Sequence, residues 1–150
     1  MEKQYKELRA RHNLPDYAVL DNDFEISTIE EEGFLLRNIR KKIIEKIDSA
    51  IKLFDDVLHP ESSFSSYREA NTFNDSDREG MIALYKKLMY FNRRSTELSF
   101  DDSDELNAKF ISGFMKEWPE LKKSVIYFVR RMKESWQKDI LKKEFVGYFG

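Results

Sequence analysis

The sequence predicts an all-α protein: an antiparallel helical bundle of about four main helices, with one or two short helices at the N-terminus. Apolar residues recur at steps of three or four along most of the 150 residues, the period of a helix. Three prolines and five glycines leave few turns for a many-stranded β fold. Aromatic residues make up 14% of the chain, which favours a packed core over disorder.

One or two short helices are expected within residues 1–26, which we interpret as an extension of the bundle. Residues 2–12 form the first, with Tyr5 on its apolar side. Pro15 suits the first position of a second helix that reaches about residue 24, because the amide hydrogen that proline lacks has no helical partner there.

The clearest predicted helix spans residues 29–58. Ser27 and Thr28 precede it, and each has a glutamate three residues later, the spacing of a capping box. Pro60 ends the helix, because the residue before a proline is disfavoured in helical geometry. The apolar stripe consists of Leu36, Ile39, Ile43, Ile47, Ala50, Phe54 and Val57.

The remaining main helices follow Pro60 and a short helix near residues 67–71. Ser76 and Glu79 have capping-box spacing and start a helix that reaches about residue 98. An acidic break at residues 101–104 starts the next helix, and Pro119 separates that helix from the last one. An apolar tail, residues 145–150, ends the chain.

The chain length suits one domain over residues 1–150. No repeat is apparent, and no apolar run approaches the length of a membrane-spanning helix. The first residues also lack the apolar run of a signal peptide. We therefore expect a cytoplasmic protein with no membrane partner.

Motifs for catalysis are largely absent. The chain has no cysteine and only two histidines, His12 and His59, which excludes thiol chemistry and the paired Glu-x-x-His motifs of di-iron bundles. The scattered glycines build no phosphate-binding loop. The sequence therefore predicts no catalytic residue, no metal site and no cofactor.

One acidic pattern resembles part of a known enzyme family. Residues 30–32 are all glutamate, and Glu45 and Asp48 follow, as in the Glu-Glu-x-x-Glu and Glu-x-x-Asp motifs of MazG-type all-α nucleotide pyrophosphohydrolases. Phe34 and Leu35 occupy the places where that family needs its third carboxylate. The resemblance, over about twenty residues, implies a third candidate function, Mg²⁺-dependent nucleotide hydrolysis by Glu31, Glu32, Glu45 and Asp48.

The net charge of −2 conceals alternating blocks, from −5 over residues 1–36 to +5 over residues 122–150. Opposite blocks on adjacent helices can neutralise each other across solvated faces. Alternatively, basic pairs gather into a footprint for RNA or the ribosome, although a pI near 5.8 argues against that as the dominant role. The candidate residues are Arg40, Lys41, Arg93, Arg94, Arg130 and Arg131.

The apolar tail is the other candidate binding element. Phe145, Tyr148 and Phe149 either pack back on the bundle or bind a protein partner or a second copy of the chain. The leading expectation is a non-catalytic intracellular interaction or assembly module, for instance a homodimer. An RNA- or ribosome-associated factor is the alternative.

Overall fold

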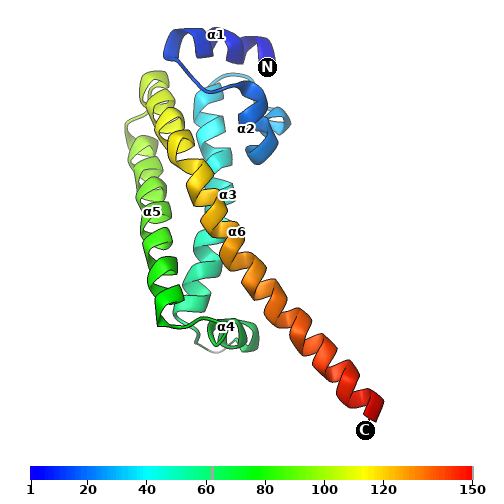
Figure 1. Cartoon of the computed structure of the whole chain (residues 1–150). Coiled ribbons are helices and arrows are strands. Elements are labelled where there is room, and N and C mark those ends of the chain that lie inside the picture. The colour runs from blue at the N-terminus through cyan, green and yellow to red at the C-terminus, as the bar shows by residue number, and fades with distance from the viewer. Residues whose placement is uncertain (62, 150) are drawn as a thin grey trace. The chain divides into compact units, whose positions relative to one another are not determined.

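The computed structural model describes the backbone of residues 1–61 and 63–149 and the side chains of residues 1–61 and 63–142. These residues form six α-helices and one short 3-10 helix, with no strand among them, which confirms the all-α prediction (Figure 1). The elements are α1 (Glu2–His12), α2 (Tyr17–Phe24), the 3-10 helix η1 (Ile26–Thr28), α3 (Leu35–Leu58), α4 (Phe64–Ala70), α5 (Asp75–Phe100) and α6 (Asp104–Phe149).

The chain divides into two compact units, and the three long helices contribute to both. Unit 1 consists of Met1–Ile51 and Lys87–Pro119, and unit 2 of Lys52–Lys86 and Glu120–Gly150. Each unit therefore joins segments that are distant in the sequence, and each has buried apolar side chains of its own. None of the described helices is long and apolar enough to cross a membrane.

Helix α3 begins at Leu35, later than predicted, so the capping boxes assigned to Ser27 and Thr28 are wrong. Both residues lie in η1 instead. Gly33 and Phe34 then have φ angles of +89° and +50°, which a right-handed helix excludes. The backbone must complete this left-handed turn before the helix can start.

The other long helices begin with side-chain caps. At the start of α5, the Asp77 amide donates to Asn74 Oδ1 at 2.8 Å and the Asn74 amide donates to Asp77 Oδ2 at 3.1 Å. At the start of α6, Ser103 Oγ accepts from the Leu106 amide at 3.1 Å. Each bond satisfies an amide without a helical partner, and the α5 cap is Asn74 rather than the predicted Ser76.

Helix α6 continues through Pro119, where the sequence predicted a break between two helices, and on to Phe149. Pro119 donates no amide hydrogen, so the carbonyl of Met115 loses its helical partner. Pro119 itself is exposed. The division between the two units on α6 falls at this proline.

The core of unit 1 contains an aromatic cluster that joins α2 to α5 and α6. The Phe114 ring centroid lies 5.7 Å from that of Phe24 and 5.1 Å from that of Phe91, both edge to face. Trp118 packs on Phe24, and its indole Nε1 donates to Asp23 at 2.8 Å. Such aromatic pairs contribute about 0.5–1.5 kcal/mol each beyond their burial, so α2 belongs to this core.

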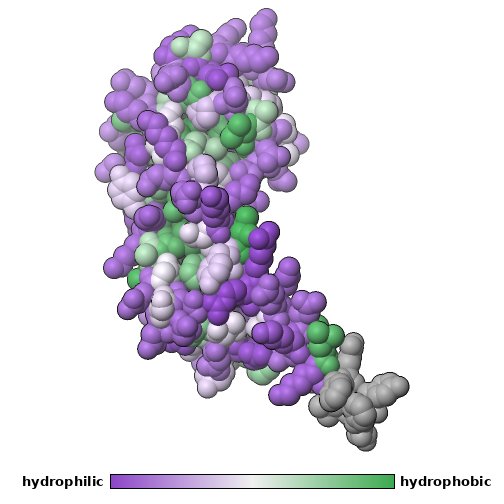
Figure 2. Space-filling model, in the orientation of Figure 1, coloured by the Kyte–Doolittle hydropathy of each residue, from purple (hydrophilic) through white to green (hydrophobic). Residues whose placement is uncertain are grey.

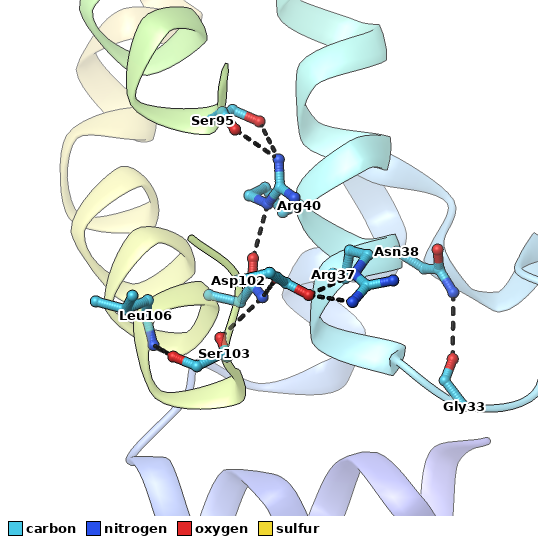
Figure 3. A network of polar contacts seen from close by, with 9 residues as sticks. Gly33, Arg37, Asn38, Arg40, Ser95, Asp102, Ser103 and Leu106 are labelled. Atoms are coloured by element: carbon cyan, nitrogen blue, oxygen red, sulfur yellow. Dashed lines mark hydrogen bonds and ion pairs between the residues drawn. The ribbon is translucent and has the colours of Figure 1, made fainter. Parts of the chain in front are cut away.

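A buried arginine of α3 connects the three long helices within unit 1 (Figure 3). Arg40 is only 3% exposed. Its Nε donates to Asn107 Oδ1 of α6 at 2.7 Å, and its Nη1 donates to the Ser95 carbonyl oxygen of α5 at 2.9 Å. Nη1 also donates to the Ser95 hydroxyl oxygen. Arg40 therefore fixes which side of α5 faces the core.

The charge of Arg40 is balanced through an amide rather than by direct contact with an acid. Asn107 Nδ2 donates to Asp102, and Asp102 also accepts from Arg37 Nε at 2.6 Å. Burial lowers the pKa of the Arg40 guanidinium, and the nearby Asp102 carboxylate opposes that change. The network keeps the buried guanidinium hydrogen-bonded and places the negative charge of Asp102 near its positive charge.

Unit 2 is built around Phe128 of α6. Its ring centroid lies 6.0 Å from that of Phe54 on α3 and 5.8 Å from that of Phe73, which precedes α5. Arg131 of α6 pairs with Asp77 at 2.7 Å and donates to the Thr72 carbonyl oxygen at 3.2 Å. These contacts hold the start of α5 against α6.

Replacing Arg40 with methionine is expected to lower the free energy of unfolding by about 2–4 kcal/mol, because buried acceptors on Ser95 and Asn107 lose a charged donor. The matched control is Lys41→Met, at the next, exposed position of α3, which should change stability by about 0.5 kcal/mol or less. Urea unfolding followed by circular dichroism measures both variants. Equal stability of the two would contradict a structural role for the network.

Candidate functional site

Helices α5 and α6 carry the same short pattern of residues. Residues 89–97 read Met-Tyr-Phe-Asn-Arg-Arg-Ser-Thr-Glu, and residues 126–134 read Ile-Tyr-Phe-Val-Arg-Arg-Met-Lys-Glu. The two segments share an apolar residue, Tyr-Phe, Arg-Arg and a final glutamate. We call them the α5 motif, which lies in unit 1, and the α6 motif, which lies in unit 2.

Both motifs present a tyrosine to solvent and a phenylalanine to the core. Tyr90 and Tyr127 are 61% and 51% exposed, whereas Phe91 and Phe128 are buried. Each tyrosine ring meets the following phenylalanine edge to face, with centroids 5.3 Å apart in the α5 motif and 5.1 Å apart in the α6 motif. The core therefore supports the tyrosine while much of its ring remains open.

The second arginine of the α5 motif, Arg94, is half-buried. Its guanidinium lies over the Phe110 ring, 5.7 Å from the centroid. A Cβ at Gly113 would lie 3.3 Å from Arg94 Nη1, so the glycine gives the guanidinium a few tenths of an ångström more room. Arg94 therefore packs against α6 within unit 1.

The second arginine of the α6 motif, Arg131, has a corresponding place. Its guanidinium lies over the Phe73 ring, 5.0 Å from the centroid, and it pairs with Asp77. Hydrogen bonding to Asp77 raises the pKa of Arg131 and lowers that of the aspartate. Arg131 Nη1 also donates to the Tyr127 hydroxyl oxygen at 3.3 Å, which helps to orient the ring.

The first arginine of each motif is more open. Arg93 and Arg130 are both exposed. Arg93 Nη1 donates to the neighbouring Asn92 Oδ1 at 2.6 Å. Within the part of the chain that the structure describes, Arg130 has no hydrogen bond or ion pair. These guanidiniums keep donors for a ligand.

Each motif lines a shallow groove on its own unit. The groove of the α5 motif has a volume of about 570 Å³ and is lined by Met89, Tyr90, Arg93, Arg94 and Glu97. The groove of the α6 motif has a volume of about 500 Å³ and is lined by Lys123, Ile126, Tyr127, Arg130, Arg131 and Glu134. Both grooves combine an aromatic face, two guanidiniums and one carboxylate.

A surface of different chemistry lies in unit 2, where α4 packs on α6. Arg68 of α4 donates through Nε and Nη2 to the two carboxylate oxygens of Asp139, both at 2.7 Å. The Phe64 and Trp136 ring centroids lie 6.2 Å apart. These contacts hold α4 in place, yet Phe64 and Tyr67 remain 77% and 62% exposed.

The same surface continues along α6. Ile140 lies one turn after Trp136, on the same face of the helix, and is 59% exposed. We call Phe64, Tyr67, Trp136 and Ile140 the α4–α6 patch. Hydrophilic side chains cover most of the face shown in Figure 2. Phe64, Tyr67 and Ile140, by contrast, are large apolar side chains that are more than half exposed.

The predicted nucleic-acid residues fall into two groups. Arg40 is buried and bonded to Ser95 and Asn107, so it is not available to a ligand, and its neighbour Lys41 is exposed. The other four are the arginine pairs of the two motifs. Sequence reasoning singled out these pairs but missed Tyr90 and Tyr127, which only the nine-residue similarity would have indicated. The two motifs start at residues 89 and 126, 37 residues apart, a spacing within the usual range of repeat periods, so this signal is present in the sequence itself.

The other candidates lie outside both motifs. Phe145, Tyr148 and Phe149 are in the last turns of α6, and their side chains lie outside the described residues. The four acidic candidates are split, because Glu31 and Glu32 precede α3 whereas Glu45 and Asp48 lie on it. No group of three or more metal-binding side chains is found among the residues that the structure describes.

No protein-family model, curated protein or solved structure matches this chain. Among the described residues, the two motifs and the α4–α6 patch each bring together exposed side chains of binding chemistry.

The Asp77–Arg131 pair should make unit 2 sensitive to acid. Hydrogen bonding by Arg131 holds the pKa of Asp77 below its ordinary value. The pair therefore stabilises the fold fully above the unfolded-state pKa of about 3.9, and this stability is lost as the pH falls through the lower folded-state pKa. We expect Asp77→Asn to melt at a lower Tm than the wild type at neutral pH and to lose less Tm on acidification.

Thermal melting at a series of pH values between about 2 and 6 measures this difference. Asp75→Asn is the matched control, because Asp75 is an exposed acid in the first turn of the same helix. It should keep the wild-type pH profile. Parallel profiles for Asp77→Asn and the wild type would show that the pair does not contribute.

Proposed function

We propose that this protein is a non-catalytic assembly module, in which the α4–α6 patch binds a second copy of the chain. The observation that carries the proposal is the exposure of Phe64, Tyr67 and Ile140 on two helices that Arg68 and Asp139 hold together. Large apolar side chains gathered on one surface favour burial by a partner.

A second copy is the partner that this geometry favours. In a two-fold symmetric dimer the same patch is used on both copies, so each residue of the patch contributes two buried side chains to the interface. The patch also lies on the helix that continues into the apolar tail, with Phe145 and Tyr148 in the following turns. The sequence of that tail, with Phe145, Tyr148 and Phe149, extends the apolar composition of α6 beyond the patch.

Charge distinguishes this association from binding to a polyanion. Residues 122–150 carry a net charge of +5, so two copies of this segment repel each other at low ionic strength. Added salt screens the repulsion, and the dimer should therefore become tighter as salt is raised.

Ile140→Ser and Phe64→Ser are each expected to weaken dimerisation by about tenfold or more, because each removes an apolar contact from both sides of the interface. Size-exclusion chromatography with light scattering, over a range of protein concentrations, measures the change. The matched control is Phe100→Ser, an 88% exposed phenylalanine in unit 1.

The control should dimerise like the wild type, and all three variants should keep the wild-type circular dichroism spectrum. A wild-type protein that remains monomeric at about 100 μM, or an equal loss of dimer in Phe100→Ser, would contradict the proposal.

A further inference from the structure

We propose that the α5 and α6 motifs are binding sites for single-stranded nucleic acid. In each motif a base stacks on the exposed tyrosine, and a phosphate next to that base binds the first arginine. This inference uses other residues than the dimer interface proposed above and does not depend on it.

The tyrosines have the surroundings that a stacking platform needs. Tyr90 and Tyr127 are more than half exposed, and an edge-to-face contact with Phe91 or Phe128 fixes each ring. A ring that is already held loses little conformational freedom when a base stacks on it. Stacking accepts any base, because every base has a π face.

The first arginine of each motif lies close enough to the tyrosine to bind the phosphate next to a base stacked on that ring. Arg93 is three residues after Tyr90, and Arg130 is three residues after Tyr127, so each pair shares one face of its helix. Both pairs line the same groove of their own unit. A guanidinium presents a planar fork of donors that matches two phosphate oxygens, and the short separation suits a base and its adjoining phosphate.

The two arginines of each motif have different roles: the second packs within its unit, and the first is available to bind a phosphate. Arg94 lies over the buried Phe110 ring, and Arg131 lies over the buried Phe73 ring and 5.7 Å from the centroid of Tyr127. Packing within each unit therefore accounts for these two arginines. Packing does not account for an exposed tyrosine together with an exposed arginine, since neither Arg93 nor Arg130 supports the core. Both motifs nevertheless have this pair at the same spacing.

The ligand is single-stranded rather than double-stranded or simply anionic. The chain has a net charge of −2, and each groove includes a glutamate, Glu97 or Glu134. Charge alone is therefore a weak source of affinity, and stacking has to supply much of it. Paired bases in a duplex cover each other's faces, whereas unpaired bases offer them to aromatic side chains.

Fluorescence anisotropy with the full chain tests the proposal. The probes are a labelled 20-nucleotide RNA without internal pairing, DNA of the same sequence, the corresponding DNA duplex, and inorganic polyphosphate as a competitor without bases. We expect one or both single strands to bind at least about tenfold more tightly than the duplex, and polyphosphate to compete poorly at equal phosphate concentration. Comparison of the affinities for the two single strands then identifies RNA or DNA as the preferred ligand.

Tyr90→Ser and Tyr127→Ser should each weaken binding at their own site by about 5- to 150-fold, the loss expected for one stacked base. Tyr90→Phe keeps the ring and should bind like the wild type. Arg93→Gln and Arg130→Gln should each reduce the slope of log K against log salt by about 0.7, the value for one phosphate contact on a single strand.

Phe100→Ser is the matched control, because Phe100 is 88% exposed but lies outside both motifs and outside the α4–α6 patch. This variant should leave nucleic-acid binding unchanged. Failure of the dimer proposal would be seen in the light-scattering experiment and not in the anisotropy measurements. The inference is overturned if no single strand binds, if duplex or polyphosphate binds equally well, or if the tyrosine-to-serine variants bind like the wild type while melting normally.

Discussion

The buried charge of Arg40 is the constraint on which unit 1 depends. A guanidinium removed from water is unfavourable unless its donors and its charge are satisfied, and Arg40 meets this requirement through Ser95, Asn107 and, one step further, Asp102. Because Ser95 has to face Arg40, the orientation of α5 about its own axis is fixed. Tyr90 and Arg93 then lie on the other side of α5, where the groove is.

In unit 2 the tyrosine of the motif is exposed in the same way, but a different set of contacts fixes the orientation of the helix. There the arginine of the motif itself, Arg131, pairs with Asp77 and lies over Phe73, while Phe128 fills the core. In both units the buried members of the motif set the orientation of the helix, and Tyr127 or its counterpart Tyr90 is exposed as a result. The same nine-residue pattern therefore gives the same surface in two different surroundings.

The two kinds of surface differ in the forces that a partner would exploit. The α4–α6 patch offers apolar side chains and should bind more tightly as salt screens the repulsion between like charges. The grooves offer an aromatic face and guanidiniums, and their binding should weaken as salt competes for phosphates. Because these responses have opposite signs, the two binding events can be separated even if both occur in one protein.

The sequence by itself determined the helices and much of their buried faces. Helix α1 has the predicted bounds, and nearly all of the predicted stripe on α3 is buried, from Leu36 to Val57. Helical periodicity is a local property, so one sequence is enough to read it. Only the tertiary structure decided that Pro119 lies inside α6 and that Arg40 is buried. The burial of Arg40 depends on acceptors 55 and 67 residues away, which local periodicity does not specify.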